Sequence, residues 1–386
     1  MGRFIQYSGS LLVFGVLLLL IYRILIDQGF VRAQFSKQKK VAIFFELGLL
    51  VIIMEAALFV VGFIIYNAVF GRTNIFELET IWLQGDARNM VNLAGNWFSP
   101  GNTALNGVLP FYPLILRLLG NLMGRFYFLA GVILSTLSLI TACYFLYQLV
   151  TLDYDEKVAK DSVKFLLFFP FIFYLFFPLA DSLFLALTCA SFYYMRRQKW
   201  LTVAICSLLA VLCDLRGILL ILPIGYEFAT QDKKSWRILY PLAFIAVGFS
   251  SILVFNQLEF GNPLAFLNHY SNGLNFINPV LNTDYKMQFG SIFPSLILLI
   301  VLLIGGFFAL GRIRTSYLLY AIPLSSIAFF ITWLDNRPRF FAAAFPLFIE
   351  LGLLAKNRTA NLILLFLFIV LMGFYLFCFI NFKMSF

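Results

Sequence analysis

The residues best suited to chemistry begin in a polar segment, residues 69–125, that interrupts an otherwise apolar chain. Asp86 in this segment is a carboxylate that could accept the proton of a hydroxyl while that hydroxyl displaces a phosphate from carbon. Such a reaction also needs positive charge for the departing phosphate. Arg216, Arg339 and Arg337 are candidates, because a guanidinium binds phosphate oxygens in a bidentate manner. This pattern indicates transfer from a phosphate leaving group.

Other interpretations of these residues remain open. Asp86 precedes Ala-Arg-Asn, a pattern that also suits a turn or a helix N-cap. Arg216 and Arg339 could extend to the membrane surface, or pair with Asp214 and Asp335. His269 is the only histidine, so a zinc site is not expected. No Gly-rich loop of the Walker type is present, which argues against direct use of a nucleotide as an energy source.

Composition places the chain among helical membrane proteins. Of its 386 residues, 62% are hydrophobic and 12% charged, and the mean hydropathy is +0.93, whereas soluble domains are about 25% charged. Apolar runs long enough to cross a bilayer recur along the chain, and they lack the alternation of a barrel strand. The net charge of +10 comes from short basic clusters between these runs, so nucleic acid is not an expected partner.

The apolar runs predict a single all-α polytopic domain, residues 1–386, with about twelve transmembrane helices and a range of ten to thirteen. Five cysteines lie inside these runs without metal-binding spacing. The predicted spans are 10–22, 41–68, 126–150, 163–178, 181–195, 200–213, 217–229, 238–256, 291–311, 316–333, 340–355 and 359–381. Several are short and form close pairs broken by a polar residue, so half-helices or merged spans among them are an open alternative.

The distribution of Lys and Arg predicts the orientation. Eighteen of the 28 basic residues fall in one set of connections, which the positive-inside rule assigns to the cytoplasm. Both termini and the two long loops, 69–125 and 257–290, are then extracytoplasmic, and the first loop is expected to contain short interfacial helices. Asp86, Asp181, Arg216 and Arg339 all fall on this same face, which makes it the expected site of chemistry.

Six stretches in order resemble the GT-C glycosyltransferases, and most of all the GPI mannosyltransferase 2 (PIG-V-like) family with its prokaryotic relatives. Asp86-Ala87 with Ala94 and Trp97 is similar to that family's first large outer loop. The other five stretches are Leu109 to Leu114 (Phe-Pro-x-Tyr-Pro), Leu179 to Phe184 (Glu-Ser-Leu-Phe), Leu209 to Gly217 (ending in Arg-x-x-Gly), Phe260 to Phe266 (Gly-Asp/Asn-Pro-Leu-Ala-Phe) and Arg339 to Leu347 (Arg-Tyr…Phe-Pro). The chain departs from the pattern at Gly85, Met90 and Asp181, which bears on substrate identity.

This resemblance implies a GT-C fold and transfer of a sugar, mannose or another hexose, from a polyprenyl-phosphate carrier with inversion. It implies Asp86 as the general base and Arg216 and Arg339 as contacts to the donor phosphate, a role for which Arg337 is a candidate from its predicted place at an outer helix end. The assigned substrate-side residues are Arg88, Tyr112, Asp181, Asn262 and His269.

The resemblance also bears on partners and location. The acceptor would be an extracytoplasmic cell-wall polymer or glycolipid, in the plasma membrane of a bacterium or, in a eukaryote, the ER membrane. No metal ligand is assigned, although a divalent cation (Mg or Mn) stays open because members of the superfamily differ in this respect.

Two further functions are compatible with the sequence. Glu55 lies deep inside a predicted span, where an ionisable residue is costly and usually functional. It would suit a lipid-linked glycan flippase or other secondary transporter, although such proteins place polar residues at mid-depth and show repeats. A non-catalytic subunit that binds lipid is the third interpretation.

Overall fold

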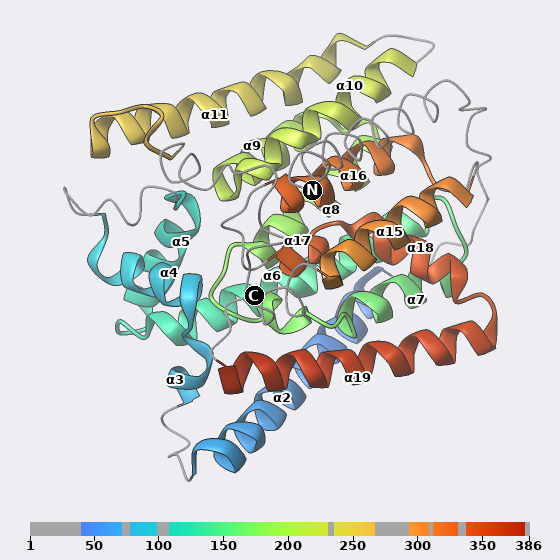
Figure 1. Ribbon diagram of the computed structural model, residues 1–386. Coiled ribbons are helices and arrows are strands. Elements are labelled where there is room, and N and C mark those ends of the chain that lie inside the picture. Colours follow the sequence, from blue (N-terminus) through green and yellow to red (C-terminus); the bar gives the residue numbers. More distant parts are fainter. Residues whose placement is uncertain are drawn as a thin grey trace, which may run out of the picture.

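The structure, a computed structural model, describes residues 40–71, 78–98, 108–230, 235–266, 293–308, 312–330 and 337–382, and these form helices and turns without a strand (Figure 1). The α-helices are α2 (Lys40–Phe70), α3 (Leu78–Trp82), α4 (Gly85–Asn96), α5 (Phe111–Leu122), α6 (Tyr127–Val150), α7 (Glu156–Leu167), α8 (Asp181–Arg196), α9 (Trp200–Cys213), α10 (Ile221–Thr230), α11 (Leu239–Phe260), α15 (Phe293–Phe308), α16 (Thr315–Phe330), α17 (Arg337–Ala342), α18 (Phe345–Leu354) and α19 (Arg358–Phe382). Three 3-10 segments join them: η3 (Ile172–Leu175), η4 (Leu215–Leu220) and η5 (Trp236–Ile238).

Four helices in the described residues are long and apolar enough to cross a membrane: Val41–Phe70, Tyr127–Val150, Trp236–Phe260 and Arg358–Asn381. Helices α2, α11 and α19 leave most of their apolar side chains uncovered, whereas half of α6 is buried. This is the pattern of peripheral helices that face lipid around a central helix that faces protein. The chain is therefore a helical membrane protein.

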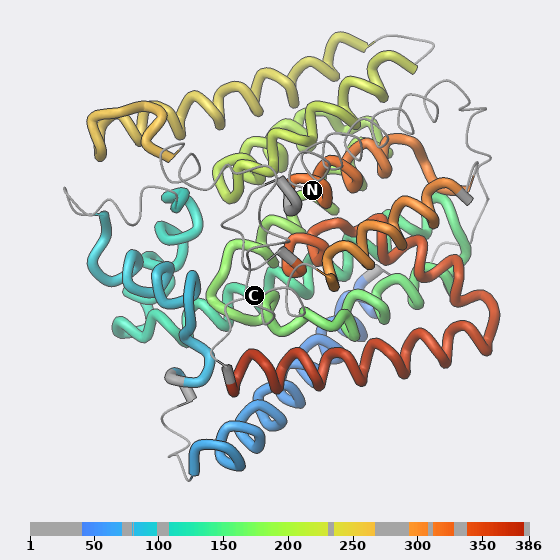
Figure 2. Tube along the Cα trace, in the orientation of Figure 1, coloured from blue at the N-terminus to red at the C-terminus, as the bar shows by residue number. Residues whose placement is uncertain are grey.

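Long helices form a bundle with a separate group of short helices at one end (Figures 1 and 2). Helix α6 packs on α8, α8 on α9, and α9 on α11, while α2 contacts both α6 and α19. The short helices α3, α4 and α5 gather at the end where α6 begins (Figure 1). They lie within the 69–125 segment, where short helices were predicted.

Twelve continuous spans are not what the described residues form. The predicted span 10–22 lies outside them, as does most of the predicted loop 257–290. The predicted span 163–178 is wrong as a single helix, because α7 ends at Leu167 and the chain continues through η3 to Ala180 without an α-helix. Pro170 and Pro178 account for this, since proline lacks the N–H that an interior helical position requires.

Two further predicted spans are also interrupted. The span 217–229 begins within the 3-10 segment η4 and becomes α-helical only at α10. The span 340–355 is divided into α17 and α18 by a break at Ala343 and Ala344. Pro346 then stands in the first turn of α18, where the missing N–H has no cost.

The non-helical segment 168–180 is enclosed by phenylalanine. Almost all of its residues are buried. Phe169 contacts Phe348 of α18 with ring centroids 5.4 Å apart, and Phe171 contacts Tyr375 of α19 at 4.4 Å. Irregular backbone is tolerated at membrane depth only where protein covers it, and these aromatic side chains provide the cover.

A buried ionic cluster joins the connections at the far end of the bundle. Asp153 accepts from Arg196 Nη2 at 2.6 Å, from Arg314 Nε at 3.0 Å and from the Tyr317 hydroxyl at 2.8 Å. Burial opposes ionisation of Asp153, but the two guanidinium groups hold its pKa below the ordinary value. Lys356 pairs with Asp155 nearby at 3.0 Å. These basic residues all belong to the set predicted on the cytoplasmic face.

Candidate active site

Asp86 lies in the first turn of α4, after a tight turn. Gly85 adopts a φ of 51°, a left-handed conformation that glycine accepts without steric cost. Gln84 is extended and occupies the N-cap position, so the interpretation of Asp86 as the N-cap residue is wrong. Arg88 donates through Nε and Nη2 to the carbonyl of Leu83, at 3.2 and 3.0 Å. Arg88 thereby closes the turn that presents Asp86.

Trp82 fixes this turn to the membrane helix α2. Its side chain is 1% exposed and contacts Phe59 and Phe177, with ring centroids 4.8 and 5.4 Å away. Gly62 of α2 makes room for the indole, because a Cβ at position 62 would lie 2.4 Å from Trp82 Cζ2. The glycine and the indole together hold α3 and α4 against the bundle.

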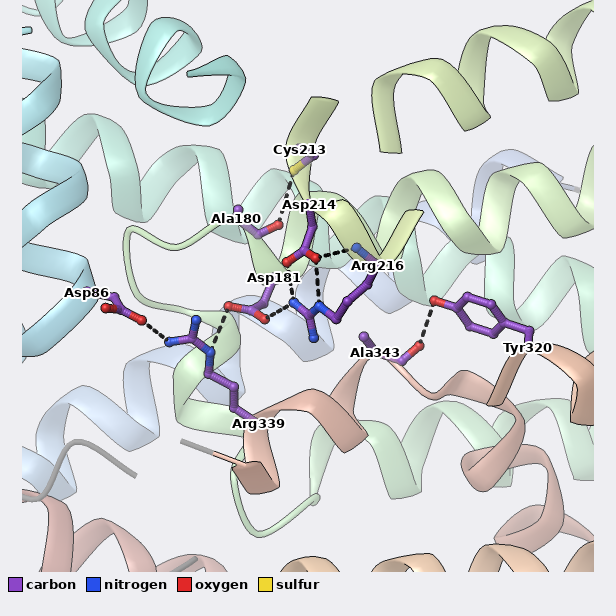
Figure 3. Close-up of polar contacts among 9 residues, drawn as sticks. All are labelled: Asp86, Ala180, Asp181, Cys213, Asp214, Arg216, Tyr320, Arg339 and Ala343. Carbon is purple, nitrogen blue, oxygen red and sulfur yellow. Dashed lines mark hydrogen bonds and ion pairs between the residues drawn. The ribbon is translucent and has the colours of Figure 1, made fainter. Parts of the chain in front are cut away.

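Arg339 at α17 connects Asp86 to the interior (Figure 3). Its Nη1 donates to Asp86 Oδ2 at 2.8 Å. Its Nε lies 3.4 Å from Asp181 Oδ2, at the first residue of α8. Nη2 of Arg339 contacts no partner in the described part of the chain, and it is not among the fully buried atoms. Burial would lower the pKa of Arg339, but Asp181 and Asp86 raise it, so the side chain is a cation.

Arg216 continues the network inward. Its Nε and Nη2 donate to Asp214 Oδ1 and Oδ2 at 2.8 and 2.5 Å, and Nη2 also donates to Asp181 Oδ1 at 3.0 Å. The guanidinium is centred 4.1 Å above the ring of Phe340. Burial opposes ionisation of Asp214, but Arg216 holds its pKa below the ordinary value. Gly217 allows this geometry, since a Cβ there would meet the Val211 backbone nitrogen at 2.6 Å.

We name these five residues, Asp86, Arg339, Asp181, Arg216 and Asp214, the Asp–Arg network (Figure 3). Carboxylates and guanidiniums alternate along it, and its formal charge is one negative. Exposure of the side chains falls from 47% at Asp86 to 13% at Arg339 and 2% at Asp181. The Asp86 end of the network therefore meets the surface, whereas Asp181 and Arg216 lie in the interior, and Asp214 is 23% exposed.

The predicted site residues divide into two groups. Asp86, Asp181, Arg216 and Arg339 come together from four separate parts of the chain. Arg216 is 7% exposed and held by two carboxylates, so the structure gives it internal partners in place of an open face. Sequence reasoning noted Asp214 only as an alternative partner of Arg216, a role that the bidentate contact bears out.

Other predicted residues lie away from the network. Tyr112 is 1% exposed and contacts Ser135 of α6 at 3.4 Å, which leaves it no surface for a substrate. Asn262 is exposed and accepts from the Leu264 amide at 2.9 Å in a turn after α11. His269 and the side chain of Arg337 lie outside the described residues. Trp82 and Gly62 were missed, because only the fold shows that they are complementary.

A divalent cation does not fit this arrangement. Among the described residues, no group of three or more His, Cys, Asp or Glu side chains could hold a metal ion. Asp86 and Asp181 are the two nearest carboxylates, and both are directed at Arg339, whose positive charge takes the place that a cation would need.

Comparison with known proteins adds no family to these observations. No protein-family model matches the chain, and no curated protein is significantly similar to it.

Proposed function

We propose that the protein is a membrane glycosyltransferase that moves a sugar from a polyprenyl-phosphate carrier to a glycan or glycolipid acceptor. The observation that carries this proposal is the contact between Asp86 and Arg339. A half-exposed carboxylate lies 2.8 Å from an arginine that has a free nitrogen, next to helices that border lipid. A base and a phosphate-binding cation are the two groups that this transfer needs.

The reaction follows from these two groups. The acceptor hydroxyl attacks the anomeric carbon of the sugar, and its proton passes to Asp86 Oδ1 or Oδ2. The new bond joins the acceptor oxygen to the anomeric carbon, while the bond from that carbon to the phosphate oxygen breaks with both electrons. The polyprenyl phosphate leaves as an anion beside Arg339, and the configuration at the anomeric carbon inverts.

The other members of the Asp–Arg network position Arg339. Asp181 holds the Nε side of the guanidinium, and Arg216 with Asp214 holds Asp181. This largely buried set of ion pairs fixes the cation before substrate arrives, which lowers the entropic cost of orientation. In this proposal Arg216 acts through Asp181 and does not itself touch the phosphate. Asn262 and His269 stay candidates for substrate contact and Arg337 stays a candidate for the donor phosphate, on the sequence arguments alone.

The proposal includes a location. The Asp–Arg network would lie on the extracytoplasmic face, in a bacterial plasma membrane or in the ER membrane of a eukaryote. Its basis is the excess of Lys and Arg in the opposite connections. The acceptor would then be a cell-wall polymer or glycolipid on that face.

The test is the surface-glycan composition of a strain that lacks this gene, complemented with wild type, Asp86→Asn or Glu79→Gln. Glu79 is an exposed carboxylate in the same segment and serves as the matched control. We expect wild type and Glu79→Gln to restore a missing sugar and Asp86→Asn, at equal abundance in the membrane, to fail. If Asp86→Asn restores the missing sugar, the assignment of Asp86 as the base is wrong.

A transporter is the second candidate, and one contact favours it. Glu55, midway along α2, accepts from the Thr136 hydroxyl of α6 at 2.7 and 2.9 Å. A transporter of lipid-linked glycans would accumulate the complete glycan lipid on the inner face of the deletion strain, with no single sugar missing. Glu55→Gln would then reproduce the deletion.

A further inference from the structure

The contact between Asp86 and Arg339 also bears on the order of events at this site, on the premise that the proposed function holds. An incoming phosphate takes two neighbouring N–H groups of a guanidinium when it binds in a bidentate manner. Arg339 has two such edges: Nε with Nη2, and Nη1 with Nη2. Each edge includes the free Nη2, so the choice depends on Nε and Nη1.

The Nε edge is closed. Nε of Arg339 is fully buried and faces Asp181 Oδ2 at 3.4 Å. Asp181 is 2% exposed and receives Arg216 Nη2 at 3.0 Å on its other oxygen, so it is fixed from behind. A ligand from the surface therefore has to approach the Nη1–Nη2 edge.

That edge is the one that Asp86 holds. Asp86 Oδ2 accepts from Nη1 at 2.8 Å, so a phosphate on the Nη1–Nη2 edge would stand directly against this carboxylate, and the two anions would repel each other at one nitrogen. Asp86 is also the partner able to move, because 47% of its side chain is exposed and it lies on the short helix α4. Displacement of Asp86 costs little, since an ion pair with a half-exposed partner contributes little to stability.

We propose that the Asp86–Arg339 ion pair is a latch that the donor phosphate opens. Before the donor arrives, Asp86 is held by Arg339 through Oδ2, so this oxygen is not available to the acceptor hydroxyl. The phosphate takes Nη1 and Nη2, and the released carboxylate becomes available to the acceptor hydroxyl. The base is active only when a donor is in place, so donor binding precedes activation of the acceptor.

The latch predicts competition, which equilibrium binding can measure. The full-length protein in lipid nanodiscs is titrated with a polyprenyl monophosphate. Asp86→Asn removes the competitor, and we expect its Kd to fall about fivefold, the equivalent of about 1 kcal/mol. Glu79→Gln removes an exposed carboxylate that has no part in the latch and should change the Kd less than twofold.

A second background separates competition from simple charge repulsion. In Arg339→Gln there is no guanidinium to share, so Asp86→Asn should have little effect there. An equal tightening in both backgrounds would mean general repulsion and would overturn the latch. If Arg339→Gln weakens binding at least tenfold but Asp86→Asn leaves the Kd of the wild-type background unchanged, the latch is wrong and the phosphate site stands.

The same measurements report on the proposed function by itself. If Arg339→Gln, eluting as a monodisperse protein, binds the polyprenyl monophosphate as tightly as wild type, Arg339 is not the phosphate site, and the latch falls with it. Arg339→Lys keeps the positive charge but lacks the two neighbouring N–H groups that bind phosphate in a bidentate manner. It is the control for a folding defect in the glutamine variant. We expect its affinity to lie between those of wild type and Arg339→Gln.

Discussion

Replacement of Gly62 by alanine tests how the site is attached to the membrane helices. The new Cβ would lie 2.4 and 2.5 Å from Cζ2 and Cη2 of Trp82, more than 1 Å inside the usual contact distance. The indole cannot move aside freely, because it is 1% exposed and lies against Phe59 and Phe177. Either the ring or α3 has to shift.

The magnitude follows from two opposing terms. Overpacking of this kind costs about 1–3 kcal/mol, and exchange of glycine for alanine in a helix returns about 0.5–1 kcal/mol. The net loss should be about 1 kcal/mol, within extremes of about 0 and 2.5 kcal/mol by these two terms. Trp82 is four residues before Asp86, so sugar transfer should fall further than this loss of stability requires.

The assay is thermal denaturation of the purified protein together with the glycan readout described above. Gly373→Ala is the matched control, since α19 leaves open space around that glycine, and it should be neutral or stabilising. In a Trp82→Leu background the obstacle is gone, and Gly62→Ala should become as harmless as the control. If Gly62→Ala matches Gly373→Ala with Trp82 present, or if its penalty survives Trp82→Leu, the packing argument is refuted.

Three further predictions concern buried ionisable side chains. Arg216→Ala should lower stability by about 3–5 kcal/mol, because it leaves carboxylates without a partner, and Arg216→Lys should recover only part of this in thermal denaturation. Stability that depends on Asp153 should be present above about pH 4, the ordinary range of an aspartate, and be lost as pH falls further, since the folded pKa is lowered; Asp153→Asn should flatten this profile in melting curves. Gly305→Ala should destabilise by about 1 kcal/mol after the helix gain of alanine is subtracted, because its Cβ would meet the Glu350 carboxyl (the Oε2 atom), and Glu350→Ala as a second change should recover part of the melting temperature.

Much of the site could be predicted because an apolar chain restricts where charge can go. Asp181, Arg216 and Arg339 fall at the ends of apolar runs and Asp86 falls in the polar segment 69–125, and all four lie on one predicted face. An unpaired charge is costly in such an apolar chain, so charged groups pair with one another. Residues far apart in sequence therefore form one network. The ion pairs at the far end of the bundle likewise join residues predicted on the other face.

The features that could not be predicted from the sequence depend on contacts between distant parts of the chain. Residues 163–178 have the hydropathy of a span, and only their two prolines signal the irregular path that they take. Tyr112 belongs to a family-like motif, but its partner Ser135 and its burial are set by how α5 meets α6. Gly62 looks like any glycine in an apolar helix, because nothing nearby in sequence identifies the indole that fills its place.

The enclosed segment 168–180 has a consequence for the order in which the protein is made. A membrane helix satisfies its own backbone and can enter the bilayer as soon as it is synthesised, whereas this segment cannot. Its aromatic cover includes Phe348 and Tyr375, which emerge from the ribosome about 170 residues or more after it. Residues 168–180 therefore cannot complete their packing until α18 and α19 have been synthesised. Loss of α18 and α19 would leave residues 168–180 without this aromatic cover, even though every residue of the Asp–Arg network had been translated.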